Sequence, residues 1–390
     1  MTRGLAVLLA FTSAVAVGNI YLPQAIIPLI AAGLHTSPQG AATAVTAIQA
    51  GYTAGMFLLV PLGDRVPHRR LLPALLALAA LGLFASGLAP NLPVLTAACV
   101  LTGLTTIAAP LSGPLVAALV PASRRGSVLG TIAAGSMGGM LLIRTFSGSL
   151  GEWLGWRAPF LVAGTTTLLL AFLLSRTVPY VPPPSGDRYL DLLASAFRLL
   201  RTEPDLRRSA FYQATVFAAF SAVWTCAAFL LSGPAYGFGA QAVGLLALVG
   251  AASMVCTPLA GRMADRYGPD RVNTVCLVAV LASTVLLVPG ARGGPLGLVA
   301  LVVGALVLDA AMQSGMIANS ARVLAVRPDA RARLNTAFMT CAYTGGTVGS
   351  WLGAHTYTKT GWPGVCALAA ALCALALTRH ALAVRARKSA

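Results

Sequence analysis

Charged residues are scarce in this chain of 390 residues. Asp, Glu, Lys and Arg together make up 9% of it, against ~25% in an average soluble domain. Hydrophobic residues make up 57%. So few polar groups cannot cover a surface that faces water, which excludes a protein built from soluble domains. The composition indicates an integral membrane protein.

Acidic residues and lysines are the rarest of the charged groups. The chain has 10 acidic and 27 basic residues, and only Lys359 and Lys388 are lysines. The net charge of +17 does not indicate a nucleic-acid partner, because the arginines are spread over alternate loops between apolar segments, as in membrane proteins. The preference for arginine is typical of a GC-rich genome. It leads to the hypothesis of a bacterial inner (plasma) membrane protein.

The chain also lacks the usual groupings of catalytic and metal-binding residues. Its seven cysteines all lie in apolar segments without paired spacing, and its four histidines have no cysteine or carboxylate at metal-ligand spacing. A phosphate-binding Walker loop is absent as well. We therefore expect no enzyme activity, no cofactor and no metal.

Long apolar segments are abundant. Each is about 20 residues long, enough to cross a ~30 Å hydrocarbon layer as a helix, and none alternates like a barrel strand. The first is too long for a cleaved signal peptide. Twelve transmembrane helices are predicted, at roughly 5–32, 40–62, 71–89, 92–120, 126–149, 158–176, 209–233, 241–262, 272–289, 295–321, 334–357 and 363–384.

The basic residues test this count. The test starts with Arg3 in the cytoplasm and lets successive helices cross the membrane in opposite directions. All but four of the 27 basic residues then fall on the cytoplasmic side. The exceptions are Arg144, Arg157, Arg292 and Lys359. Both termini are therefore expected in the cytoplasm.

A charged hairpin occurs twice, at Val60–Arg70 and at Gly261–Arg271. The corresponding aspartates are Asp64 and Asp265, 201 residues apart, so the two copies mark equivalent points of two halves. We predict an all-α fold of two pseudo-symmetric six-helix bundles, 1–176 and 209–390. A cytoplasmic linker, 177–208, joins them, with a stiff proline-rich spacer at 179–184. An amphipathic helix on the membrane surface follows, its apolar face formed by Leu190, Leu193, Phe197 and Leu200.

Two six-helix halves with this hairpin after the second helix of each resemble the major facilitator superfamily over essentially the whole chain. The segments Leu308–Gln313 and Arg333–Thr336 are similar to the group of twelve-span drug:proton antiporters, which includes sugar and nucleoside exporters. Five features depart from that pattern. Val60 and Pro67 stand where glycines are usual, and His68 stands where a basic residue is usual. The fourth helix, with Leu101–Thr106, carries no arginine, and Gly135–Gly139 replaces the Gly-Pro-rich motif of the fifth.

The resemblance implies a role for the cytoplasmic loop motif. Asp64 would hold one conformational state by facing the positive N-terminus of a neighbouring helix, with Asp265 as the weaker counterpart. The alternative is that the arginines of the hairpin only set the topology. The candidate residues are Asp64, Arg65, Arg69, Gly261, Asp265 and Arg266.

Polar residues inside the predicted spans are the candidates for transport. Asp309 is the only carboxylate predicted near the centre of the bilayer, where the charged form is costly. It is the candidate for proton coupling, and an interhelical hydrogen bond is the alternative role. The resemblance places helices 1, 4, 7 and 10 around the central cavity, so the cavity candidates are Asn19, Gln24, Thr105, Gln213, Trp224 and Gln313. For these neutral residues structural hydrogen bonding is the alternative.

Arg144 is the candidate for an outer gate. It is predicted about four residues from the outer end of its helix, hence ~6 Å deep. At that depth an arginine can extend its guanidinium to water, and a direct pair with the deeper Asp309 is not expected.

Small residues recur at every fourth position of two predicted helices. They are Ala47, Gly51 and Gly55 in one, and Gly345, Gly349 and Gly353 in the other. Such spacing permits close helix packing. It is compatible both with a smooth surface on which two halves move and with static packing.

The pattern as a whole predicts a secondary active transporter, a monomer that exports a small organic molecule in exchange for protons, in contact with membrane lipid. Two alternatives stay open. One is an uncoupled facilitator or importer of the same fold, and the other is a membrane sensor or scaffold that transports nothing.

Overall fold

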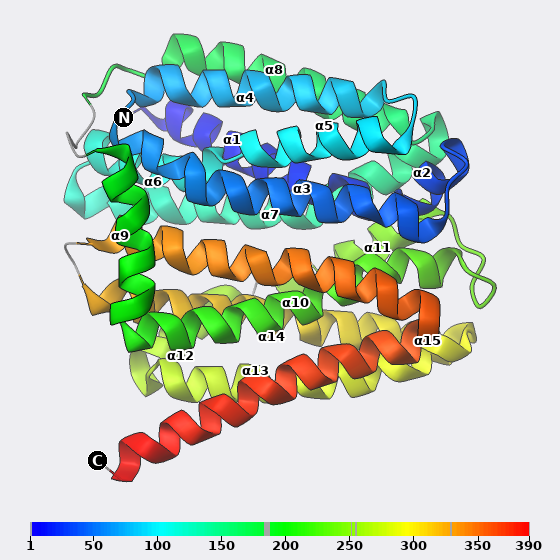
Figure 1. The fold of residues 1–390 in the computed structure, drawn as a ribbon. Helices are drawn as coiled ribbons and strands as arrows, with labels where there is room; N and C mark the ends of the chain where they lie inside the picture. The colour runs from blue at the N-terminus through cyan, green and yellow to red at the C-terminus, as the bar shows by residue number, and fades with distance from the viewer. Residues whose placement is uncertain (1, 183–187, 251, 254–255, 328–329, 390) are drawn as a thin grey trace. The chain divides into compact units, whose positions relative to one another are not determined.

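The computed structural model describes residues 2–182, 188–250, 252–253, 256–327 and 330–389. Within these residues the chain is helical and no strand is formed, which confirms the predicted all-α fold. The chain divides into two compact units, Met1–Ala194 and Ser195–Ala390 (Figure 1). The predicted spacer at 179–184 lies partly outside the described residues.

Unit 1 holds the first helices of the chain. They are α1 (Arg3–Tyr21), η1 (Leu22–Gln24), α2 (Ile27–Gly33), α3 (Pro38–Leu58), η2 (Val60–Asp64), α4 (His68–Gly87), α5 (Leu92–Thr105), α6 (Ala108–Leu119), α7 (Ala122–Leu154) and α8 (Arg157–Thr177). Helix α9 (Tyr189–Thr202) crosses from unit 1 into unit 2.

Unit 2 holds the remaining helices. They are α10 (Pro204–Ser232), α11 (Ala240–Gly250), α12 (Cys256–Tyr267), α13 (Pro269–Leu287), η4 (Val288–Arg292), α14 (Gly294–Val326) and α15 (Arg331–Ser389). Helix α10 is buried along nearly its whole length and packs against α14 and α15.

Local sequence explains where several helices begin. The side chains of Ser37 and Asn91 accept hydrogen bonds from backbone N–H groups three residues further on, at 3.0 and 3.1 Å. Prolines occupy the first position of α3, α10 and α13, where the missing N–H would have no helical partner.

Ten described helices are long and apolar enough to cross a membrane. The longest, α15, is interrupted at Gly361, whose φ is 64°, and therefore contains the two predicted spans 334–357 and 363–384. The predicted span 241–262 corresponds to α11 and α12, with residues 251, 254 and 255 outside the described residues. Each of the twelve predicted spans thus has a helical counterpart.

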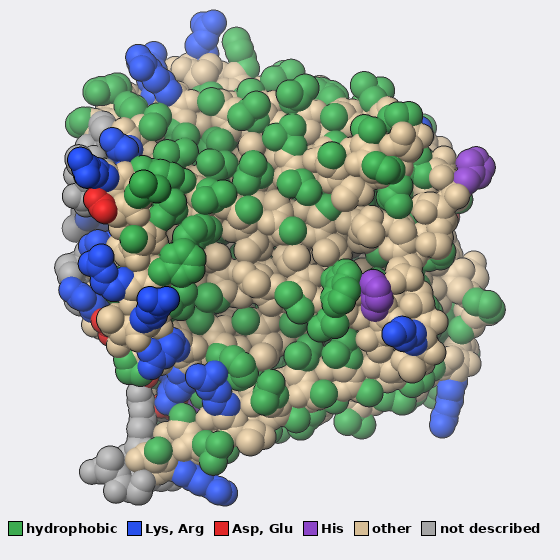
Figure 2. All heavy atoms as spheres, viewed as in Figure 1, with side chains coloured by type: hydrophobic (Ala, Val, Ile, Leu, Met, Phe, Trp, Pro, Cys, Tyr) green, Lys and Arg blue, Asp and Glu red, His purple; other side chains and the backbone are tan. Residues whose placement is uncertain are grey.

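Hydrophobic side chains cover the outside of these helices. Figure 2 shows them spread over the visible surface. Large apolar side chains such as Phe172, Leu169 and Leu296 are mostly exposed. A surface of this kind fits surroundings of lipid rather than water.

The small-residue seam of unit 1 packs α3 against α5. A Cβ added to Gly51 would lie 2.3 Å from the carbonyl oxygen of Val100, and one on Gly103 would lie 2.0 Å from that of Ile48. Only glycine fits such close backbone approach. The seam of unit 2 has the same role, because Gly345 and Gly349 lie against the backbone of α10. Both seams are packing within one unit.

The amphipathic helix of the linker forms as α9. Its buried residues are Leu192, Ala196 and Leu199, whereas Leu190 and Phe197, on the predicted apolar face, are exposed. The placement of that face against the membrane stays a prediction. At its start the Tyr189 hydroxyl donates to the carbonyl of Leu58, at 2.6 Å.

Candidate functional site

Asp309 lies on α14 in the interior of unit 2. It is 2% exposed, and its Oδ1 accepts a hydrogen bond of 2.9 Å from Nε1 of Trp224, on α10. Among the described residues it is the only acidic side chain that is fully buried. Two of the predicted site residues are thereby brought into direct contact.

The contact is one of three between the same two helices. At 3.4 Å, Asn319 Nδ2 donates to Gln213 Oε1, and Arg322 Nη1 contacts the Ser209 hydroxyl at 3.5 Å. Since α10 and α14 run antiparallel, residue numbers rise along one helix as they fall along the other. The contacts therefore form a polar ladder, with Trp224–Asp309 at one end and Ser209–Arg322 at the other. At 1.5 Å per residue its end contacts are ~20 Å apart along α14.

Gln313 lies one turn from Asp309 on α14 and is also buried. The predicted polar group of unit 2, namely Gln213, Trp224, Asp309 and Gln313, therefore shares the two helices of the ladder. Asn319 joins them through Gln213.

In unit 1 the structure corrects the predicted surroundings of Arg144. Helix α7 continues to Leu154, so Arg144 lies ten residues, or ~15 Å, from its end. Its side chain is 0% exposed and does not reach water. The predicted end of the helix, at residue 149, was five residues too early, and so was the predicted distance of Arg144 from that end.

Arg144 instead binds a second predicted residue. Its Nε donates to Oε1 of Gln24 at 2.8 Å, and its guanidinium lies 5.0 Å from the ring centroid of Tyr21. The short helix η1 holds Gln24 after the end of α1. A buried guanidinium needs such hydrogen-bond acceptors and aromatic faces to offset lost hydration.

The other candidates of unit 1 make mostly structural contacts. Asn19 is fully buried on α1, and its Nδ2 donates to the Thr167 hydroxyl of α8 at 3.2 Å. The Thr105 hydroxyl bonds back to Leu101 in its own helix, at 2.8 Å. The hydroxyl of its neighbour Thr106 donates to the carbonyl of Ala16 on α1, at 3.1 Å. Thr106 lies between the end of α5 and the start of α6.

Asn19 also lines a groove in unit 1. The groove runs between α1, α7 and α8 and has a volume of about 570 Å³. Apart from Asn19 and Thr166, its walls are apolar side chains and three glycines. Of the predicted residues of unit 1, only Asn19 faces this groove.

The two copies of the charged hairpin fold differently. In the first copy Asp64 ends η2 and is half-buried, and Arg65 and Arg69 are exposed. In the second copy Gly261, Asp265 and Arg266 lie within α12, and both charged residues are exposed.

Turn geometry accounts for one departure between the copies. Gly268 has a φ of 81° at the start of α13, a conformation that favours glycine. The equivalent Pro67 has a φ of −55° before α4, which a proline ring adopts without strain. The second copy needs its glycine, and the first does not.

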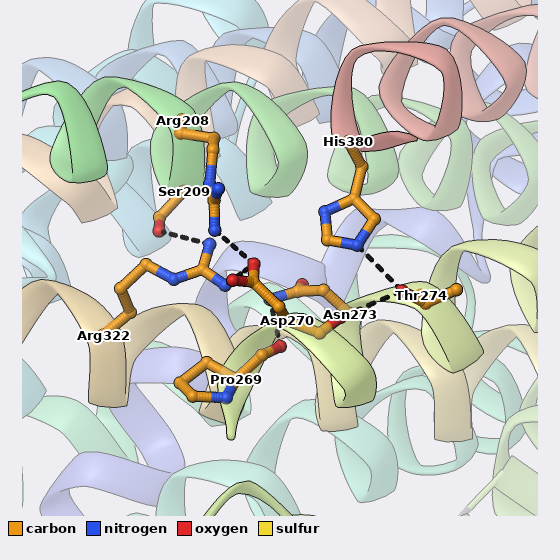
Figure 3. Close-up of polar contacts among 8 residues, drawn as sticks. All are labelled: Arg208, Ser209, Pro269, Asp270, Asn273, Thr274, Arg322 and His380. Carbon is orange, nitrogen blue, oxygen red and sulfur yellow. Dashed lines mark hydrogen bonds and ion pairs between the residues drawn. The ribbon is translucent and has the colours of Figure 1, made fainter. Parts of the chain in front are cut away.

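Asp270 is the functional candidate that the sequence did not reveal. Both Arg208 and Arg322 pair with its Oδ1, with Arg322 Nη2 at 2.5 Å (Figure 3). The two arginine side chains are 9% and 7% exposed, and that of Asp270 is 33% exposed. This cluster joins the ends of α10, α13 and α14 within unit 2.

A weak signal for Asp270 was present in the repeat. The position 201 residues earlier is Arg69, so the charge is reversed between the two halves. This reversal alone could not identify the partners of Asp270, because Arg208 and Arg322 are distant from it in sequence. Only the packing of three helices brings them together.

His380 extends the same network to α15. Its Nε2 lies 2.8 Å from the Thr274 hydroxyl, and its ring packs edge-on against Tyr212 at 5.3 Å. His380 is 1% exposed. Four helices of unit 2 therefore meet at one polar cluster (Figure 3).

One exception to the charge pattern has a structural reason. Arg157, at the start of α8, donates to the carbonyls of Gly87 and Ala89 at 3.0 and 2.8 Å and stacks over Trp156 at 4.3 Å. It thereby caps the carbonyl end of α4. The position of Arg157 outside the predicted cytoplasmic loops is therefore explained by these two hydrogen bonds rather than by membrane topology.

Comparison with known proteins places this architecture among transporters. A family model described as the Major Facilitator Superfamily matches residues 9–303 and, in a second match, residues 235–390. The chain is 36% identical over 375 residues to the Uncharacterized transporter YgaY of Escherichia coli O157:H7, covering 96% of this chain and 94% of that one.

Two further similarities are more distant. The Chloramphenicol resistance protein of Streptomyces lividans is 29% identical over 254 residues, 63% of each chain. The crystal structure of the nucleoside transporter NupG superposes with a TM-score of 0.76 at 15% identity, over 98% of this chain and 99% of that chain.

Proposed function

Since the chain belongs to the Major Facilitator Superfamily and is a membrane transporter rather than an enzyme, we propose that it exports a small organic molecule in exchange for protons. The observation that carries this proposal is the buried carboxylate of Asp309. Ionisable groups inside membrane spans are expensive and mark ion and substrate pathways.

Proton coupling follows from the chemistry of that carboxylate. Burial disfavours its charged form, and its Oδ1 is held by the Trp224 N–H, which donates to it at 2.9 Å. A proton taken up by Asp309 removes a buried charge, which permits a conformational change that the charged form opposes. Release of the proton on the other side then completes one exchange cycle.

Export is favoured over import by the similarity to a Chloramphenicol resistance protein. The α10–α14 ladder, with the carboxylate of Asp309 at one end, suits an uncharged or cationic molecule with several hydrogen-bonding groups.

Further parts of the proposal concern placement. We infer a bacterial inner membrane, two six-helix bundles at 1–176 and 209–390, and both termini in the cytoplasm. The concentration of basic residues in alternate loops of the sequence supports this orientation. Labelling of single cysteines in the loops 63–70 and 262–271 should find both on the cytoplasmic side.

Two site roles also belong to the proposal. Asp64 would hold one conformational state, and Arg144 would act at an outer gate through Gln24. Their substitution is expected to alter transport rate more than substrate binding.

The test compares Asp309→Asn with Asp191→Asn, a matched loss of one carboxylate at an exposed position outside every proposed site. Purified protein is first screened by thermal shift against chloramphenicol, nucleosides and sugars. The best ligand is then followed in proteoliposomes under an imposed pH gradient. The Asp309 variant should lose uphill transport and keep exchange, while the Asp191 variant keeps both.

The outcomes separate the alternatives. Uphill transport by Asp309→Asn at the rate of the parent would show that the residue is only structural. If flux in the parent does not depend on the pH gradient, the protein is an uncoupled facilitator. The absence of an arginine in Leu101–Thr106 favours this alternative. Failure of every ligand to cross would favour a sensor or scaffold.

A further inference from the structure

Unit 2 contains an open groove that the proposed transport cycle does not use. It has a volume of about 490 Å³, within the range of ~300–1,000 Å³ typical of small-molecule sites. All the residues that line it come from unit 2, on one face each of α12, α13 and α14. They include Leu259, Met263, Tyr267, Val275 and Ser314.

Small side chains create this groove. On α13 and α14 its floor is formed by Ala279, Ala310 and Ala311, where larger residues would fill the space between the helices. Nearer the ends of the helices the walls close, because Ala264 and Ala318 pack together with Val272 and Cys276 in a buried cluster. The result is an apolar trough with a closed end.

A guanidinium stands at that end. Arg271, in the first turn of α13, is the only charged residue that lines the groove among the described residues. It is exposed and forms no ion pair within the described chain. The carboxylate beside it in sequence, Asp270, is already bound by Arg208 and Arg322.

Two more arginines lie close to this end. Arg262 and Arg266 are exposed on α12, and Arg266 stacks over Tyr267, a groove residue, at 5.2 Å. The only carboxylate on α12 is the exposed Asp265. The apolar trough therefore ends in a region of net positive charge.

We propose that this groove binds an anionic phospholipid, with one acyl chain in the trough and its phosphate on Arg271. An apolar slot that ends in an unpaired guanidinium complements an amphiphile with a negative head group. Arginines near a membrane surface attract anionic lipids at ~1 kcal/mol each. The site is independent of which substrate is carried, and it touches α14 next to the helix turn that holds Asp309.

The experiment measures lipid binding directly. Full-length protein in detergent is mixed with phosphatidylglycerol or phosphatidylcholine and observed by native mass spectrometry. The parent should retain one phosphatidylglycerol in preference to phosphatidylcholine. Arg271→Gln should weaken that binding about five-fold, the equivalent of ~1 kcal/mol.

Two matched controls define the site. Arg292→Gln removes an exposed arginine at the other end of the α13–η4 segment and should bind lipid as the parent does. Ala279→Leu fills the groove and should reduce retention of both lipids, whereas Val278→Leu, on the exposed neighbouring position, should not. Equal melting temperatures in lipid-free detergent confirm that the variants are folded.

Several results would overturn the proposal. Equal losses for Arg271→Gln and Arg292→Gln would mean that lipid binds by diffuse charge alone. Equal retention by Ala279→Leu and the parent would place the lipid elsewhere. A dimer of the parent that Ala279→Leu converts to a monomer would show that a second copy of the chain occupies the groove.

Discussion

Replacement of Asp270 by asparagine should destabilise unit 2 through the two arginines that it leaves behind. The parent carboxylate binds Arg208 and Arg322, whose side chains are 9% and 7% exposed. Breaking a fully buried ion pair costs ~3–5 kcal/mol. Asp270 itself is 33% exposed, so water screens part of this interaction.

We therefore expect a loss of roughly 2–3 kcal/mol in the free energy of unfolding, at the low end of the cost of a broken buried ion pair. Asparagine keeps one oxygen that can accept a hydrogen bond, but it brings no negative charge. The two guanidinium groups then face each other with the charge of Asp205 as the remaining compensation at Arg322, and their repulsion adds to the lost hydrogen bonds.

The assay is unfolding of the purified protein by SDS titration in mixed micelles. Asp265→Asn is the matched control, because it removes an equal charge from an exposed position in the same motif and should shift stability by less than ~0.5 kcal/mol. A second background, Arg322→Gln, tests the coupling, since Asp270→Asn should cost less there. Equal stability of the two asparagine variants would refute the structural role of the cluster.

Two further substitutions test the packing and polar contacts of unit 1. Gly103→Ala should cost roughly 1–3 kcal/mol, because its Cβ would lie 2.0 Å from the Ile48 carbonyl. Gly113→Ala, with nothing within 4 Å, is the control, and equal thermal melting of the two would contradict the close helix crossing. Gln24→Leu removes the acceptor of Arg144 and should lower the free energy of unfolding by ~1–3 kcal/mol. Gln24→Glu keeps an acceptor oxygen and should keep the stability of the parent. Equal effects of the two substitutions in SDS titration would show that this hydrogen bond contributes nothing.

Several features of the fold could be predicted from the sequence because they depend on composition and periodicity. Long apolar segments must form helices in lipid, since no other structure satisfies the backbone there. The repeat of Asp64 at Asp265 pointed to two related halves. The glycines at every fourth position in α3 and α15 predicted close packing, although not which helix they meet.

Other predictions failed or went unmade because they depend on contacts between distant segments. The end of α7 was misjudged because the helix continues past residue 149, through Gly151 and Glu152, to Leu154. The partners of Asp270 were not predicted because its two arginines are 62 and 52 residues away in sequence.

The sequence by itself determined the class of protein, the helices and the residues whose polarity is costly in a membrane, because each of these follows from local physical chemistry. Only the tertiary structure decided the partners. It paired Asp309 with Trp224, Arg144 with Gln24, and Asp270 with two arginines. Such pairs join residues 52 or more positions apart, and their distances are set by how whole helices pack rather than by any local pattern.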